Sequence, residues 1–168
     1  FLRVDAIVQK NGGDLRAPMR IKGALFWALE DSKGKNGHLF LTSEALQKEA
    51  LQLLNAKIPI PSLRLHAQEV SDVLEDMILH GEVVSVKGDI YLPRVFAQED
   101  ETARRIAMRV VEPPAPEKIE QILEQVKREI GLALSSKQEA AVYATYRHNL
   151  SIITGSPGTG KTTVLKTI

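Results

Sequence analysis

A glycine-rich segment near the end of the sequence, Gly155 to Thr162, has the residue types and spacing that hold a nucleotide phosphate. Its three glycines permit backbone conformations that a Cβ would obstruct, so successive N–H groups can turn inward around an anion. Lys161 places an ammonium against the β- and γ-phosphates, and the Thr162 hydroxyl is positioned to ligate Mg²⁺. The segment therefore predicts binding of ATP or GTP with Mg²⁺.

The segments on either side of this loop have the order that a phosphate-binding loop requires. Leu150 to Thr154 is a short apolar run suited to a buried parallel strand, and Lys161 to Ile168 is expected to form a helix. The structural alternative is a plain glycine turn between a strand and a helix, which the flanking pattern disfavours. We therefore expect the loop to belong to an α/β nucleotide-binding domain.

A glutamine upstream of the loop has two interpretations. Gln138 lies on a helix predicted to start at Ser135 and to run to about His148, where its amide could contact the edge of adenine. Ser135 and Gln138 also have the spacing of a capping box, in which the glutamine covers the Ser135 backbone N–H. The residues alone leave adenine recognition and helix capping open.

The composition is that of a soluble globular protein. Of the 168 residues, 43% are hydrophobic and 26% are charged, and no apolar run approaches the ~18 residues that span a bilayer. Cysteine is absent, which excludes disulfides and thiolate metal sites and fits a cytoplasmic location. The net charge of +1 neither predicts nor excludes a nucleic-acid partner.

A proline cluster at Pro113 to Pro116 divides the chain into two predicted domains, residues 1–112 and 113–168. Beyond the prolines, Ile119 to Ile130 has the periodicity of an amphipathic helix. The sequence begins inside an apolar-periodic run and ends shortly after the glycine loop. We therefore expect it to be a fragment of a longer protein.

The first predicted domain is mainly α-helical with a small β-hairpin. Helical periodicity covers Pro18 to Asp31, a segment capped by Thr42, Ala67 to His80, and Gln98 to Val111, while Glu82 to Leu92 has the pattern of a hairpin. Helix, helix, hairpin is the order of a winged-helix unit. Residues 1–112 are therefore expected to have a winged-helix-like fold.

Motifs along nearly the whole chain resemble those of RecD/TraA-type superfamily-1 DNA helicases. In the second domain they are Gln138-Glu139-Ala140-Ala141-Val142, the run Leu150 to Thr154, and Gly155 to Thr163. In the first domain, Phe1 to Asp5, Pro18 to Ile21, Gly37 to Leu41 and Asp89 to Pro93 are similar to the helix-hairpin-helix and winged-helix-like region of long RecD-like proteins, which resemble the exodeoxyribonuclease V alpha subunit. Ser156 departs from the glycine often found second in the family loop.

The resemblance implies an ATP-dependent DNA helicase that moves 5′ to 3′ on single-stranded DNA with ATP and Mg²⁺. It implies that the fold of residues 113–168 is the truncated start of an α/β RecA-like domain. It also implies that Gln138 contacts adenine, that Lys161 and Thr162 are catalytic, and that Thr162 ligates the metal. The implied nucleotide-binding residues are Gln138, Gly155, Ser156, Pro157, Gly158, Thr159, Gly160, Lys161, Thr162 and Thr163.

Other parts of such a motor are expected beyond Ile168: the carboxylates that position Mg²⁺ and water, an arginine, and the second motor domain. The chain by itself is therefore expected not to hydrolyse ATP. Leu150 to Thr154, as a strand without its parallel neighbours, is expected to be locally disordered or to make an improvised contact.

Several basic residues are candidates for contacts with single-stranded or forked DNA. They are Arg16, Arg20, Lys22, Lys87, Arg104, Arg105 and Arg109. The alternative for each is an ordinary solvated surface charge. Trp27 and His38 are interpreted as core and turn packing.

Two other classes of function stay open. An AAA-type ATPase would use the same Gly155 to Thr162 loop, although its winged helix is expected after the motor and the Gln138 helix would then have no role. Alternatively, residues 1–112 grip DNA or a protein partner and the nucleotide loop is incidental.

Overall fold

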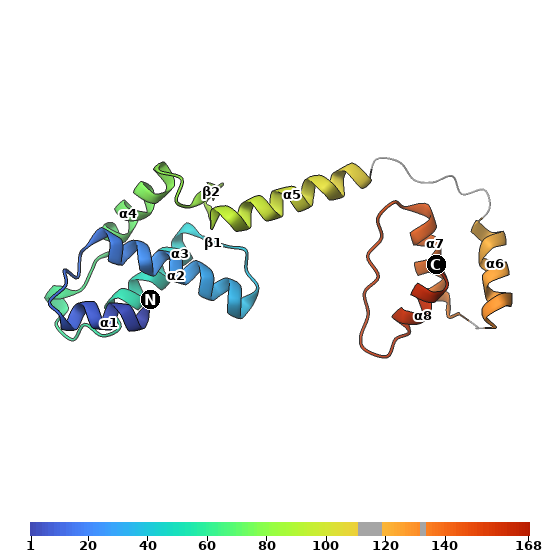
Figure 1. The fold of residues 1–168 in the computed structure, drawn as a ribbon, viewed down its shortest axis with the longest axis horizontal. Coiled ribbons are helices and arrows are strands. Elements are labelled where there is room, and N and C mark those ends of the chain that lie inside the picture. Colours follow the sequence, from blue (N-terminus) through green and yellow to red (C-terminus); the bar gives the residue numbers. More distant parts are fainter. Residues whose placement is uncertain (111–118, 132–133) are drawn as a thin grey trace. The chain divides into compact units, whose positions relative to one another are not determined.

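The computed structural model describes residues 1–110, 119–131 and 134–168, which divide into two compact units, Phe1–Asp100 and Glu101–Ile168 (Figure 1). The division falls within α5, whereas the proline boundary predicted after residue 112 lies outside the described residues. The first unit contains α1 (Leu2–Lys10), α2 (Pro18–Asn36), β1 (Phe40–Thr42), α3 (Ser43–Asn55), the 3₁₀ turn η1 (Pro61–Leu63), α4 (Ala67–Leu79), β2 (Val84–Val86), β3 (Asp89–Tyr91) and the start of α5 (Pro93–Arg109). The second contains the rest of α5, α6 (Ile119–Ile130), α7 (Ser136–Arg147) and α8 (Lys161–Lys166).

Helices α2, α3 and α4 form the core of the first unit. Each buries one stripe at helical spacing, represented by Leu25 on α2, Leu46 on α3 and Leu74 on α4. Burying a leucine side chain contributes about 1.5–3 kcal/mol of hydrophobic free energy. The helices predicted from periodicity in this region are therefore confirmed, and each has its apolar stripe in the core.

A three-stranded antiparallel sheet in the order β1-β3-β2 lies against α2 and α3. The predicted hairpin is confirmed: β2 and β3 are joined by Lys87 and Gly88, with φ angles of 53° and 92°. Positive φ at both positions is the geometry of a two-residue type I′ loop. The sequence did not predict the third strand, β1, which aligns Leu41 with Ile90 of β3.

Local signals mark the ends of several elements. The Thr42 side chain accepts a hydrogen bond from the Ala45 N–H at 3.3 Å, which confirms it as the N-cap of α3. Helix α5 starts at Pro93, earlier than the predicted Gln98, and Pro93 occupies the first helical turn, where a missing N–H costs nothing. The predicted hairpin ends at Leu92 and the predicted helix begins at Gln98, so the first residues of α5 were left out of the predicted helix.

The second unit is held by a small cluster around Val142 of α7 and Val164 of α8. Within the described residues it contains no strand, so no RecA-like sheet is evident. The predicted strand Leu150 to Thr154 does not form. In its place Ile153 packs against the cluster, and the Ser151 hydroxyl donates to the Ala144 carbonyl at 3.0 Å. A strand needs a paired neighbour, and no described segment provides one.

Candidate functional site

The glycine loop leads directly into α8, and its backbone depends on glycine at three positions. Gly158 and Gly160 have φ angles of 80° and 79°, a left-handed conformation that other residues adopt only with strain. A Cβ added to Gly155 would lie 2.8 Å from the Thr159 hydroxyl oxygen, which itself donates to the Ser156 carbonyl at 2.8 Å. The loop is therefore tightly folded on itself.

Lys161 is the first residue of α8, and its side chain reaches back across the loop. Its ammonium donates to the carbonyl oxygens of Gly155 at 2.6 Å and of Ser156 at 2.7 Å. The first N–H groups of a helix have no intrahelical acceptor, so the start of α8 directly after the loop also offers backbone donors. Thr162 follows with an exposed side chain. The start of α8 thus gathers hydrogen-bond donors and a positive charge beside an exposed hydroxyl.

Gln138 forms the capping box that was one of its two predicted roles. Its Oε1 accepts from the Ser135 N–H at 2.8 Å, and its own N–H donates to the Ser135 hydroxyl at 3.4 Å. The other end of the same amide lies at the glycine loop, because a Cβ added to Gly160 would collide with Gln138 Nε2. Capping uses the oxygen and leaves the amide nitrogen beside the loop. Contact with adenine stays a prediction.

An ion-pair network joins α6 to α7, the helix that carries Gln138. Lys127 of α6 contacts Glu139 of α7 at 2.6 Å and Glu124 of its own helix at 3.1 Å. The hydrogen bond to Glu139, and next that to Glu124, raise the pKa of Lys127 above its usual value. This network fixes α6 against the start of the Gln138 helix.

Arg20, predicted to contact DNA, has only 6% of its side chain exposed. Its Nε and Nη2 donate to the two carboxylate oxygens of Asp5 at 2.6 and 3.1 Å, and further donors reach the Leu15 and Leu54 carbonyls, each at 2.8 Å. A guanidinium so enclosed is not accessible to a phosphate in this conformation. Its partner Asp5 lies fifteen residues earlier, which no local pattern revealed.

The other predicted DNA contacts are closer to the surface. Arg16 pairs with Glu69 at 2.8 Å, and Lys22 lies between Glu82 at 2.6 Å and Asp76 at 3.0 Å. Hydrogen bonds to Glu82 and then Asp76 raise the pKa of Lys22 above its usual value. Arg16 retains 45% exposure of its side chain, whereas Lys22 retains only 15%. The Lys22 ammonium is therefore paired with two carboxylates and is largely shielded from solvent, which makes it a weaker candidate for a DNA contact than Arg16.

Basic side chains also lie on the hairpin and on α5. Lys87 is exposed at the hairpin turn, and Arg104, Arg105 and Arg109 are exposed along α5. Arg105 pairs with Glu101 at 2.7 Å within that helix. Lys87 lies in the hairpin and the three arginines lie in α5. The described positions of these residues do not bring the predicted DNA contacts together into one basic patch.

Two further interpretations are changed by the structure. Trp27, expected in the core, is 37% exposed, because it lies at the edge of α2, between the α1 side of that helix and a hollow that it lines with Glu49 and Leu53 of α3. His38 is exposed after the end of α2, with no packing role evident.

Within residues 1–110, 119–131 and 134–168, no group of three or more His, Cys, Asp or Glu could hold a metal ion. No helix in those ranges has the length and apolar character to cross a bilayer.

Comparison with known proteins relates the whole chain to a DNA helicase. No protein-family model matches the chain. Over 172 aligned residues, which include the whole chain, it is 28% identical to an ATP-dependent RecD2 DNA helicase from Deinococcus radiodurans. The chain is a distant homologue of that helicase. It spans about a quarter of the relative's length, 24%.

Proposed function

We propose that the chain is part of an ATP-dependent DNA helicase and that its glycine loop binds ATP with Mg²⁺. The observation that supports this most is the contact between the Gln138 amide nitrogen and Gly160, which brings the glutamine and the phosphate loop into one site. The distant relationship to a RecD2 helicase favours this function over an AAA-type ATPase.

The residues of the loop fit a nucleoside triphosphate. Lys161 would exchange the Gly155 and Ser156 carbonyls for the β- and γ-phosphate oxygens, since an ammonium binds an anion more strongly than a neutral carbonyl. The first N–H groups of α8 would donate to the same phosphates. The Thr162 hydroxyl would ligate Mg²⁺, and bound ATP would supply the phosphoanhydride bond whose cleavage drives the motor.

Gln138 would recognise the base while keeping its capping role. Its Oε1 is engaged by the Ser135 N–H, so Nε2 is the group that would donate to adenine. The remaining nucleotide contacts are proposed for the loop residues Gly155, Ser156, Pro157, Gly158, Thr159 and Gly160, and for Thr163 of α8. These assignments make the α7 start and the loop one binding unit.

DNA is the proposed polymeric substrate, with movement 5′ to 3′ along a single strand. Among the basic residues of the first unit, the exposed Arg16 and Lys87 are proposed to contact phosphates, together with Arg104 and Arg105 on α5. Arg20 is not included, because its guanidinium is buried against Asp5. We further propose that the order α2, β1, α3, α4, β2, β3 is a winged-helix-like arrangement.

Replacing Lys161 tests the nucleotide site directly. In Lys161→Ala the affinity of the chain for a fluorescent ATP analogue with Mg²⁺ is expected to fall at least tenfold, because the charge facing the phosphates is lost. Binding is measured by fluorescence anisotropy at constant salt.

The matched control is Lys166→Ala, which removes an exposed lysine from the last turn of the same helix. It is expected to bind the analogue with wild-type affinity. Equal losses in the two variants would indicate nonspecific attraction to positive charge. Absence of any ATP binding by the wild-type chain would contradict the proposed nucleotide site.

A further inference from the structure

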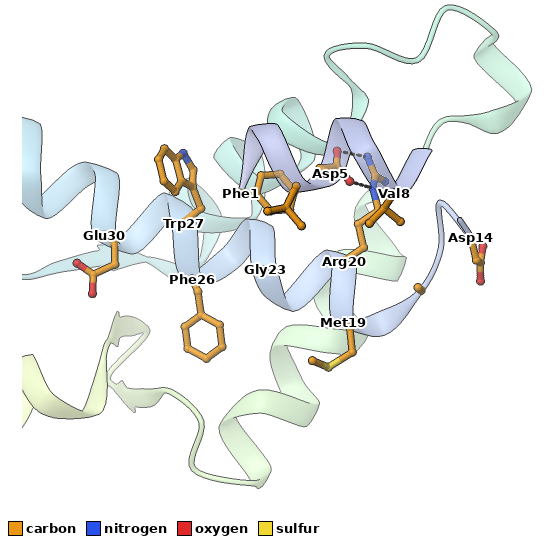
Figure 2. Close-up of a pocket in the computed structure, with 12 residues that line it drawn as sticks. Phe1, Asp5, Val8, Asp14, Met19, Arg20, Gly23, Phe26, Trp27 and Glu30 are labelled. Carbon is orange, nitrogen blue, oxygen red and sulfur yellow. Dashed lines mark hydrogen bonds and ion pairs between the residues drawn. The ribbon is translucent and has the colours of Figure 1, made fainter. Parts of the chain in front are cut away.

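A mainly apolar groove lies between α1 and one stripe of α2 in the first unit (Figure 2). Its volume is about 700 Å³. On α2 the lining residues recur at helical spacing, so they form one continuous stripe. The lining consists of Phe1, Val4, Asp5, Val8, Asp14, Ala17, Met19, Arg20, Gly23, Phe26, Trp27 and Glu30.

Large apolar side chains in this groove are exposed to solvent. Met19 is 77% exposed, Val4 65% and Val8 42%, although all three lie in a well-folded part of the chain. Exposed apolar side chains that share one concave surface indicate an interaction site, whereas singly scattered ones do not. The groove is therefore a candidate for docking.

The floor of the groove is rigid. Phe1 approaches α2 closely at Gly23, where an added Cβ would lie 3.3 Å from its ring. Below it, the buried Asp5–Arg20 pair ties α1 to α2, and Arg20 also donates to the Leu54 carbonyl of α3. A preformed groove binds a partner without the cost of ordering its own side chains.

The groove carries net negative charge, and a carboxylate lies at each of its two ends. Figure 2 shows Asp14 and Glu30 at opposite ends of the labelled residues. Both are exposed, whereas the one lining cation, Arg20, is enclosed by Asp5. From Met19 to Glu30 the stripe extends about 16 Å along α2, at 1.5 Å per residue. Three turns of a second helix match that length.

We propose that this groove binds an amphipathic helix of a protein partner, with an apolar face and a Lys or Arg near each end. The apolar face would cover Val4, Met19 and Trp27, and its cations would lie opposite Asp14 and Glu30. Nucleic acid and anionic lipid carry the wrong charge for this rim. A second copy docked through the same groove would bring like carboxylates together. The inference concerns the first unit and does not depend on the nucleotide site.

Trp27 makes the groove directly observable, because it is the only tryptophan in the sequence. The probe is a synthetic 14-residue helical peptide with leucines on one face and lysines near its ends. Titrating it against the whole chain is expected to change the Trp27 emission saturably. A twin peptide with glutamates in place of the lysines is expected to bind at least fivefold more weakly, a difference that salt reduces.

Two pairs of variants distinguish docking in the groove from general stickiness. Val4→Glu changes a lining residue and is expected to abolish binding of the lysine peptide, whereas Ile7→Glu, at a similarly exposed position of α1 outside the groove, is expected to leave it unchanged. The double variant Asp14→Asn with Glu30→Gln is expected to remove the preference for the lysine peptide. Its control on α4, Asp72→Asn with Glu75→Gln, is expected to retain that preference.

The amide variants are chosen so that the chain stays folded. Asp14 Oδ1 accepts the Arg16 N–H at 2.9 Å, and asparagine retains that oxygen. Equal binding of the lysine and glutamate peptides, or equal effects of Val4→Glu and Ile7→Glu, would overturn the proposal. So would saturable quenching of Trp27 by a single-stranded oligonucleotide, or dimerisation of the chain that Val4→Glu abolishes.

Discussion

The two units differ in what holds them together. In the first, buried apolar side chains from three helices, two strands and the loops between them form one continuous cluster, and a buried ion pair joins α1 to α2. In the second, the described cluster is centred on Val142 and Val164, and polar contacts at helix ends arrange the rest. The first unit is organised by burial, whereas the second is organised by backbone geometry and caps.

This difference explains why a site whose contacts rearrange on ligand binding is easier to build in the second unit than in the first. A large core transmits every change in volume and therefore fixes the surface above it. The loop of the second unit is arranged by the Lys161 ammonium, two positive-φ glycines and the Gln138 cap, each of which involves only a few atoms. Contacts of that kind can be exchanged for a ligand at little cost to the rest of the unit.

The largest expected effect comes from breaking the buried pair of the first unit. Arg20→Ala leaves the Asp5 carboxylate buried without its cation and is expected to lower the free energy of unfolding by about 3–5 kcal/mol. Urea denaturation followed by Trp27 fluorescence measures it.

Arg16→Ala is the control, since it breaks the ion pair with Glu69 at the surface of the same unit. Its cost is expected to be about 1 kcal/mol or less. If the two variants lost equal stability, the contrast between a core-organised and a surface-organised contact would fail. A double variant, Asp5→Leu with Arg20→Met, is expected to recover part of the loss because no charge stays buried.

An intermediate effect is expected from glycine replacements in the second unit. Gly158→Ala and Gly160→Ala both force a Cβ into left-handed backbone, at about 1–2 kcal/mol each. Only the Gly160 change also drives a methyl group into Gln138 Nε2, whereas a Cβ at Gly158 would meet no described atom within 4 Å. Gly160→Ala should therefore also disturb the capping box of α7.

Hydrogen exchange at the first turn of α7 reads out this difference. Exchange there is expected to be faster in Gly160→Ala than in Gly158→Ala, by about fivefold if about 1 kcal/mol of capping energy is lost. Combining Gly160→Ala with Gln138→Ala is expected to add little, since the two changes act on one contact. If the effects of Gly160→Ala and Gln138→Ala on exchange were additive, the loop and the capping box would not share a contact.

The smallest effect concerns pH and the lysines that each unit holds between two carboxylates, Lys22 and Lys127. The pKa of Lys22 is raised in the folded chain, so its contribution to stability is complete below its ordinary value of 10.5 and is lost as pH rises through the folded pKa. The free energy of unfolding of the first unit, measured with urea, is therefore expected to fall between about pH 10 and the higher folded pKa of Lys22.

In Lys22→Met this alkaline weakening is expected to be smaller, because no titrating lysine faces Glu82 and Asp76. Lys48→Met, which changes an exposed lysine on α3, is the control and is expected to retain the weakening. At acidic pH the dependence runs in the opposite direction, and stability is lost as pH falls. Hydrogen bonding to Lys22 lowers the pKa of Asp76, so that carboxylate stabilises the fold above its ordinary value and the contribution disappears as pH falls through the folded pKa.

Features with a local cause were predictable from the sequence. The Thr42 cap, the Ser135–Gln138 capping box and the hairpin turn at Lys87 and Gly88 each depend on residues within a few positions of one another. The bounds of α6 were predicted from its apolar period and from Gly131, the glycine that directly follows it.

Features with a distant cause were not predictable. Strand β1 is only three residues long and exists because β3 pairs with it. Arg20 has the appearance of a surface cation until Asp5 is placed against it. The run Leu150 to Thr154 was predicted in part: its apolar character indicated a strand, which does not form, whereas the expected improvised contact agrees with the packing of Ile153 and the Ser151 hydrogen bond to Ala144.

The pairing of β1 with β3 also governs the order in which the first unit can fold. Helices α2, α3 and α4 can each form while the chain is still being synthesised, but Leu41 meets its partner only once Ile90 has emerged from the ribosome. Until then Phe40 lacks the Tyr91 ring that packs against it at 5.1 Å. A nascent chain that pauses before the hairpin would expose this unpaired edge, and that is when the unit is most open to aggregation.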